Sequence, residues 1–167
     1  MADPRTVLAN YIDDLAWPAA LAVPALAFGL LFLQSGLDLE RNGASEGVAG
    51  LALLGVLLGV VVVPVTALVA WILVLPFDRS RSLGWAVRAF ALAYSPALIY
   101  GVCGLLANVI LGWNTAVAFG VTGVLWAISP LFAALREMSG DRRRLSLVLA
   151  TVVGAAVLAV WAVAVGA

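Results

Sequence analysis

The stretch that decides the fold is "AFALAYSPALIYGVCGLLANVILGWNTAVAFGVTGVLWAISPLFAAL", residues 89–135, which contains no charged residue. As a single α-helix it would be roughly 70 Å long at about 1.5 Å per residue. That is more than twice the ~30 Å hydrocarbon thickness of a bilayer, so the run must fold back on itself. The predicted turn is "LGWNT", residues 111–115, because Gly112 and Asn114 interrupt helices and Trp113 suits a membrane interface.

The composition of the whole chain also indicates a bilayer as its solvent. Of the 167 residues, 65% are hydrophobic and only 11% are charged, whereas about a quarter of the residues in a soluble domain are charged. Histidine, the commonest metal ligand and general base, is absent. The single cysteine, Cys103, excludes an intramolecular disulfide. Together with the lack of catalytic sequence motifs, these features predict a protein that is not an enzyme and binds no cofactor or metal.

The uncharged runs predict five membrane-spanning helices, because each run is long enough for one or two spans of about 20 residues. The predicted spans lie near residues 16–36, 48–76, 84–110, 114–136 and 145–166. The predicted fold class is therefore all-α, an integral membrane bundle of five transmembrane helices with an N-terminal amphipathic helix. Two domains are expected, a cytoplasmic amphipathic segment at 1–15 and a transmembrane domain at 16–167.

The arginines predict the orientation of this bundle. With five spans, the N-terminus and the second and fourth loops share one side, and that side holds every arginine except Arg41. By the positive-inside rule, the N-terminus is cytoplasmic and the C-terminus is outside, in a multi-pass protein of the cell membrane. The outer loop "DLERNGASEG", residues 38–47, is predicted to be a solvated linker.

The segment "REMSGDRRR", residues 136–144, is the densest basic cluster of the chain. We interpret it chiefly as a topology signal and secondly as a contact for anionic lipid headgroups, since arginines near the cytoplasmic leaflet attract such lipids. Gly140 suits the end of the fourth helix and Asp141 the N-cap of the fifth. The predicted headgroup contacts are Arg136, Arg142, Arg143 and Arg144.

Residues 1–15 show apolar positions at helical spacing, including Val7, Leu8, Tyr11 and Ile12. This pattern indicates an amphipathic helix at the cytoplasmic surface of the bilayer. It could act as a membrane wedge or partner surface, or it could dock on its own bundle. We favour docking, because the polar face lacks bases to hold anionic lipid.

Small residues and prolines predict how the spans pack and bend. Gly55 and Gly59 lie on one helical face, which allows close approach of another helix. Pro64 and Pro96 fall within predicted spans, where each removes a backbone hydrogen bond and favours a kink.

Tyr94, Ser95 and Asn108 form a candidate intramembrane polar site in the third span. No acidic residue lies deep in any predicted span, whereas proton- or cation-coupled transporters usually place an ionisable group there. Polar residues in membrane helices more often join helices to one another. We therefore prefer helix packing over transport as their role.

The order of these parts resembles the Yip family, five-span proteins named for interacting with Ypt/Rab GTPases, and particularly its prokaryotic members. The resemblance rests on "AYSPALIYG" in the third span and on "LWAISPLFAALREMSGDRRRLSLVLATVV" across the fourth and fifth. The matching residues are Ala93, Tyr94, Ser95, Pro96, Leu135, Arg136, Glu137, and Gly140 through Arg144. The eukaryotic members of the family are associated with membrane trafficking, bilayer shaping and GTPase recruitment, and the resemblance implies no catalytic residues.

Two functional hypotheses follow. The first is a non-enzymatic membrane scaffold, assembly partner or bilayer organiser, which contacts anionic lipids and a membrane-protein partner or further copies of itself. The alternative is a small permease or transport subunit that moves a substrate past Tyr94, Ser95 and Asn108. The sequence has no basic segment interleaved with aromatic residues, so nucleic-acid binding is not predicted.

Overall fold

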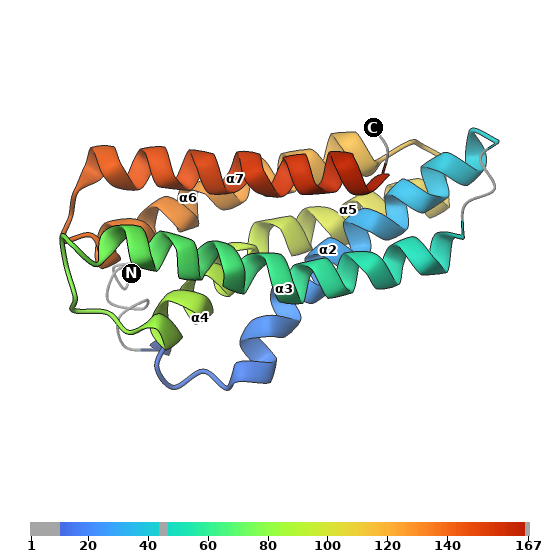
Figure 1. Ribbon diagram of the computed structural model, residues 1–167. Helices are drawn as coiled ribbons and strands as arrows, with labels where there is room; N and C mark the ends of the chain where they lie inside the picture. Colours follow the sequence, from blue (N-terminus) through green and yellow to red (C-terminus); the bar gives the residue numbers. More distant parts are fainter. Residues whose placement is uncertain (1–10, 44–46, 166–167) are drawn as a thin grey trace, which may run out of the picture.

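The computed structural model describes residues 11–43 and 47–165, and these form an all-α bundle (Figure 1). Its elements are α2 (Trp17–Arg41), α3 (Val48–Val74), α4 (Leu83–Ala93), α5 (Ser95–Leu111), the π-helix η1 (Ala116–Val121), α6 (Thr122–Met138) and α7 (Arg143–Val165). Five segments are long and apolar enough to cross a membrane: α2, α3, α4 with α5, η1 with α6, and α7. The predicted fold class is confirmed, and the helices are those of an integral membrane protein.

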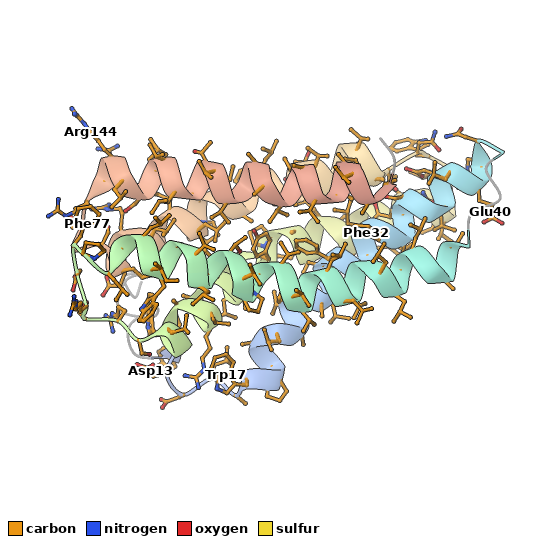
Figure 2. All side chains as sticks on the ribbon, in the orientation of Figure 1. Asp13, Trp17, Phe32, Glu40, Phe77 and Arg144 are labelled. Atoms are coloured by element: carbon orange, nitrogen blue, oxygen red, sulfur yellow. The ribbon has the colours of Figure 1, made fainter. Side chains whose placement is uncertain are left out.

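The two ends of the bundle carry different side chains. Phe77 and Arg144 lie at one end and Glu40 lies at the opposite end (Figure 2). We call the first the arginine end, because the α3–α4 and α6–α7 turns place most of the arginines there. We call the second the Asp38 end, because it holds the last turn of α2 and the α5–η1 turn.

Of the predicted amphipathic segment, residues 1–10 lie outside the described residues. Ile12 is buried and Tyr11 is exposed. The guanidinium of Arg88 donates a hydrogen bond to the Asp13 carbonyl at 3.0 Å and lies over the Trp17 ring. The chain that enters α2 is therefore held against α4.

Helix α2 continues to Arg41, beyond the predicted end of the first span at residue 36. The prediction of a solvated linker from residue 38 is therefore wrong for the residues up to Arg41. The reason is tertiary: the Asp38 carboxylate accepts hydrogen bonds from the α5–η1 turn, which stabilises an additional helical turn in α2.

The contact between α2 and α3 is the most extensive in the bundle. A Cβ added at Gly59 would lie 2.3 Å from the carbonyl oxygen of Pro24, and one at Gly55 would lie 2.5 Å from that of Phe28. Both glycines are buried and allow backbone to meet backbone, as the sequence predicts.

The third span is interrupted at Tyr94, which separates α4 from α5. Pro96 lies in the first turn of α5, a position where the missing N–H costs little. Tyr94 closes the break by donating its N–H to the Ala91 carbonyl and accepting from the Leu98 N–H. The predicted kink is thus a break between two helices.

Glycines with positive φ end two of the spans. Gly112 has a φ of 68° directly after α5, and Gly140 has a φ of 61° after α6, so the predicted breaker at Gly112 and the predicted helix end at Gly140 are confirmed. Asp141 also has a positive φ of 65°, and its carboxylate pairs with Arg136. The prediction that Asp141 caps the fifth helix is wrong, since α7 begins at Arg143 and the ion pair draws Asp141 back toward α6.

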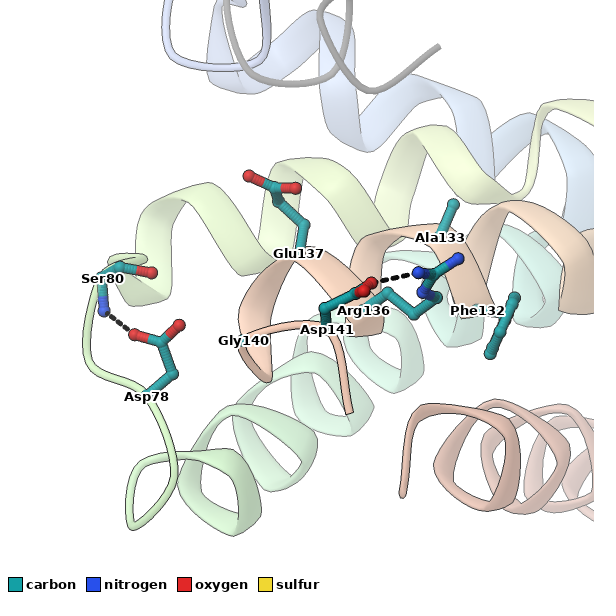
Figure 3. Close-up of a pocket in the computed structure, with 8 residues that line it drawn as sticks. All are labelled: Asp78, Ser80, Phe132, Ala133, Arg136, Glu137, Gly140 and Asp141. Carbon is teal, nitrogen blue, oxygen red and sulfur yellow. Dashed lines mark hydrogen bonds and ion pairs between the residues drawn. The ribbon is translucent and has the colours of Figure 1, made fainter. Parts of the chain in front are cut away.

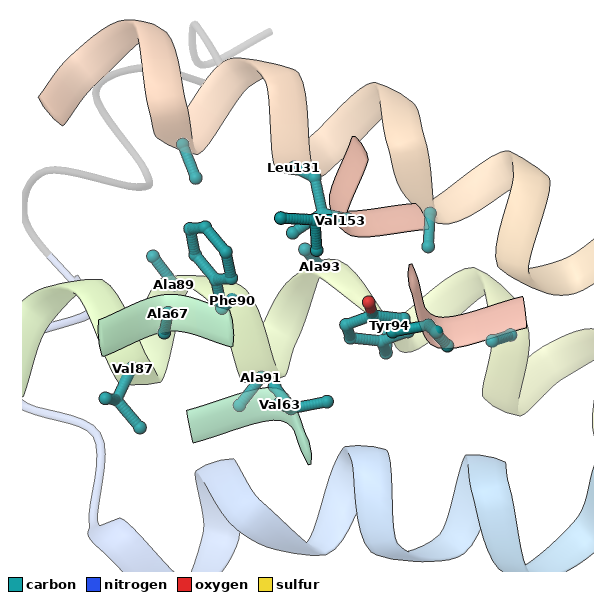
Figure 4. Close-up of a cluster of buried hydrophobic side chains, with 14 of the residues drawn as sticks. Val63, Ala67, Val87, Ala89, Phe90, Ala91, Ala93, Tyr94, Leu131 and Val153 are labelled. Carbon is teal, nitrogen blue, oxygen red and sulfur yellow. The ribbon is translucent and has the colours of Figure 1, made fainter. Parts of the chain in front are cut away.

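The core lies where α4 packs against α2, α3 and α6. Figure 4 shows part of it, a cluster of buried side chains that includes Val63, Phe90, Leu131 and Tyr94. Helix α7 packs mainly on α6 and touches α2 and α3 at few points. The outer face of α3 exposes large apolar side chains such as Val61, Leu57 and Ile72, which suits contact with lipid.

Candidate functional site

A cavity of about 480 Å³ opens at the arginine end, between the α3–α4 turn and the end of α6 (Figure 3). It is lined by Asp78, Ser80, Phe132, Ala133, Arg136, Glu137, Gly140 and Asp141. The positive φ of Gly140 allows the chain to turn at its rim.

Three of the four charged side chains that line this cavity form ion pairs within the chain, and the fourth, Asp78, accepts a backbone hydrogen bond. Arg136 pairs with Asp141, and Arg81 pairs with Glu137. The Asp78 carboxylate accepts a hydrogen bond from the Ser80 N–H at 2.8 Å, and this bond holds the pKa of Asp78 below its usual value. The side chains around the cavity therefore form a polar network that holds the α3–α4 turn against the end of α6 and the α6–α7 turn. Within residues 11–43 and 47–165, no group of acidic or cysteine side chains is placed to hold a metal ion.

The four predicted headgroup contacts fall into two sets. Arg136 lies in the cavity, with its guanidinium over the Phe132 ring. Arg142, Arg143 and Arg144 lie together at the start of α7 and are exposed. Together with Phe77 and Leu145 they line a second hollow of about 400 Å³, so the three consecutive arginines are the set available to a ligand.

The candidate polar site of the third span is not brought together. Tyr94 is fully buried, with its ring edge against Phe28, and its hydroxyl has no hydrogen-bond partner among the described residues. Ser95 lies on the exposed side of the helix break. Asn108 is almost four turns further along the same span, at the Asp38 end. These residues do not line one common path.

Asn108 instead belongs to a clamp at the Asp38 end. Its side-chain amide donates to the Asp38 carboxylate at 2.6 Å and to the Thr115 hydroxyl at 3.2 Å. The other carboxylate oxygen of Asp38 accepts from the backbone N–H groups of Thr115 and Ala116, at 2.8 and 2.9 Å. The Arg41 guanidinium donates to the Asn108 side-chain oxygen at 3.1 Å. We call these four side chains the Asp38 clamp, which ties α2 to the turn between α5 and η1.

The position of the Asp38 carboxylate in the clamp has a simple electrostatic reason. A carboxylate at the N-terminus of η1 meets N–H groups that have no partner within the helix and the positive end of the helix dipole. Sequence reasoning missed this role, because it placed Asp38 in a solvated loop. The available signal was the stretch 37–41, which contains no glycine or proline and therefore favours continuation of the helix past residue 36.

A second buried polar layer lies about one turn deeper. The Gln34 amide donates to the carbonyls of Leu30 and Gly101, at 3.1 and 2.9 Å. The indole of Trp161 donates to the Ser35 hydroxyl at 3.1 Å and fastens α7 to α2. Near the opposite end of α7, the hydroxyls of Ser139 and Ser146 are 2.9 Å apart. Helix α7 is thus attached to the bundle by one polar contact near each end.

No protein-family model matches the chain, and neither a curated protein nor a solved structure is significantly similar to it.

Proposed function

We propose that this protein is a non-enzymatic integral membrane protein of the Yip type, which acts as a scaffold, assembly partner or bilayer organiser. The proposed location is the cell membrane, with the arginine end in the cytoplasm. The uneven distribution of arginines supports this orientation.

The observation that carries the proposal is where the intramembrane polar side chains lie. A permease needs polar groups that line one path, and an ionisable group midway if transport is coupled to an ion. Here Tyr94 packs in an apolar core, and Asn108 is engaged by Asp38 at one end. The Gln34 side-chain nitrogen and the Ser35 hydroxyl form hydrogen bonds within or between helices. This arrangement favours a structural role for the polar groups.

A second observation supports assembly with other membrane components. Large apolar side chains cover the outer faces of several helices, and Ser95 interrupts this cover at the helix break. A serine on a lipid-facing surface can hydrogen-bond across to a neighbouring helix. We propose the surface around Ser95 as a contact for a membrane-protein partner or for a second copy of the chain.

The proposal is tested by purifying the tagged protein in native lipid and measuring the mass of the complex by mass spectrometry. The wild type is compared with Ser95→Leu. We expect a stoichiometric partner or a homo-oligomer with the wild type, and its loss with Ser95→Leu. Thr151→Leu, the same kind of change at an exposed position on α7, is the matched control and should leave the assembly intact. A wild-type protein that is monomeric and carries a small solute would contradict the proposal and favour the permease.

A further inference from the structure

Helices α3 and α7 lie side by side along the bundle and run in opposite directions (Figure 1). They touch at few points, and hollows remain between them. The hollow nearer the arginine end measures about 250 Å³ and is lined by Val65, Thr66, Val69, Ala70, Leu73, Leu149, Val152, Val153 and Ala156. A hollow of about 400 Å³ further along is lined by Leu54, Leu58, Ala159, Val160, Val163 and Ala164. We call this row of hollows the α3–α7 seam.

The residues that line the seam form one continuous face on each helix. On α7 they recur at 149, 152, 153 and 156, and on α3 at 73, 70, 69, 66 and 65 in the opposite direction. This spacing of three and four residues is that of a single helix face. The one hydroxyl among them, of Thr66, donates to the Val63 carbonyl and so offers the seam no free donor. The seam is therefore an apolar groove suited to hydrocarbon.

Phe77 and Leu145 lie one helical turn beyond Leu73 and Leu149 toward the arginine end, and with the three arginines they line the neighbouring hollow. The guanidinium of Arg142 lies 4.6 Å from the centre of the Phe77 ring, which keeps it beside α3. The ion pairs among the described residues involve Arg41, Arg81, Arg88 and Arg136, and none involves Arg142, Arg143 or Arg144. Three cations thus stand together at the mouth of an apolar groove.

The dimensions of the seam fit one leaflet. At about 1.5 Å per residue, Leu149 and Ala156 lie roughly 9 and 20 Å along α7 from Arg143. Half of the ~30 Å hydrocarbon core is about 15 Å. A molecule whose phosphate meets the arginines would therefore extend its acyl chain into the nearer hollow.

We propose that the α3–α7 seam is a binding site for one anionic phospholipid. Its phosphate is held by Arg142, Arg143 and Arg144, and one acyl chain fills the hollow between Val69 and Ala156. A partner helix would have to supply acidic residues opposite the arginines, whereas a phospholipid brings the phosphate and the chain in one molecule. The inference deepens the headgroup contact proposed above by naming the acyl-chain groove, and it does not require the assembly role.

The test uses purified, delipidated protein and native mass spectrometry with dioleoylphosphatidylglycerol or dioleoylphosphatidylcholine added. We expect one phosphatidylglycerol to be retained in preference to phosphatidylcholine. The triple change of Arg142, Arg143 and Arg144 to Gln should weaken this retention on the order of 100-fold. Ala156→Leu, which fills the hollow while keeping every arginine, should weaken it about tenfold.

Two matched controls separate the groove from general effects on the protein. Ala155→Leu adds the same side chain to a neighbouring exposed position outside the seam. On the other helix, Val69→Trp fills the hollow, whereas Leu53→Trp adds a tryptophan at an exposed position on a different face of α3. We expect Ala155→Leu and Leu53→Trp to bind lipid like the wild type. If either seam variant fails to fold, the other still provides the comparison.

Several results would overturn the inference. Equal retention of the two lipids would show that the arginines do not select charge. Unchanged binding in Ala156→Leu and Val69→Trp would place the lipid elsewhere. A dimer that is lost in these two variants would make a second copy of the chain the occupant. Competition by glycerol phosphate as effective as that by the whole lipid would leave the acyl groove without a role. Assembly with a partner, measured separately, can fail without affecting any of these outcomes.

Discussion

The two sides of helix α3 differ in how they meet their neighbours. Toward α2, Gly55 and Gly59 bring the backbones so close that an added Cβ would collide with carbonyl oxygens. Toward α7, the helices leave a row of apolar hollows, with three arginines at one end. The first contact is completed by the chain itself, whereas the second leaves space that we propose a lipid fills. The same helix thus serves as part of a fixed core and as one wall of an open groove.

The largest loss of stability is expected from a substitution that prevents the close contact between α2 and α3. Gly59→Ala should lower the free energy of unfolding by about 3 kcal/mol, since the new methyl group meets the backbone of Pro24 and neither helix can yield locally. Unfolding by denaturing detergent in mixed micelles would measure it. Gly50→Ala, in the same helix with open space around it, should raise stability by about 0.5 kcal/mol. Equal effects at the two positions would mean that α2 and α3 do not touch as described.

The next effect concerns the Asp38 clamp, which holds the far end of α2. Asp38→Ala leaves two backbone N–H groups and the Asn108 amide without their acceptor, and we expect a loss of about 2 kcal/mol in the same unfolding measurement. Glu40→Ala, two residues away and exposed, should change stability by less than about 0.5 kcal/mol. A neutral Asp38→Ala would argue that residues 38–41 are solvated after all.

A smaller loss of stability should follow from removing the hydrogen bond that attaches α7 to α2. Trp161→Phe removes the hydrogen bond to Ser35 and keeps most of the buried ring, so we expect a loss of about 1 kcal/mol. Trp126→Phe changes a tryptophan that is 59% exposed on α6 and should be close to neutral. If Trp126→Phe were the more costly change, α7 would not be fastened to α2 by this contact.

The smallest effect on folding is expected within the seam. Ala156→Leu should alter the free energy of unfolding in lipid-free detergent by less than about 0.5 kcal/mol, since it adds an apolar side chain to a hollow. Thermal unfolding with and without added phosphatidylglycerol would then show a smaller lipid-dependent stabilisation than in the wild type. A large loss of stability without lipid would indicate that α3 and α7 already pack tightly against each other.

The features predictable from the sequence are those governed by local chemistry. The 47-residue uncharged run requires a turn, and Gly112 provides it with a positive φ. Gly55 and Gly59 are spaced to form a close contact, and they do. The end of the fourth helix at Gly140 follows from the same preference of glycine for the left-handed region.

Features that depend on distant partners could not be predicted in the same way. The role of Asp38 depends on N–H groups 77 and 78 residues away, which no local pattern indicates. Asp141 has the chemistry of an N-cap, but its backbone N–H bonds to the Arg136 carbonyl at the end of α6, and its φ of 65° lies outside the extended region that an N-cap adopts. The exposure of Ser95 depends on the geometry of the helix break at Tyr94. The hollows of the α3–α7 seam depend on the loose packing between these two helices, which no local pattern indicates.

The most direct test of the account is the side of the membrane on which the arginine end lies, because the proposed leaflet and the proposed anionic lipid both depend on it. After replacing Cys103 with Ala, single cysteines are placed at Asn42 and Ser80, exposed positions near opposite ends of the bundle. A membrane-impermeant thiol reagent is then added to intact cells. The account predicts that Asn42→Cys is labelled and that Ser80→Cys is labelled only after the membrane is opened. Labelling of Ser80→Cys in intact cells would contradict it.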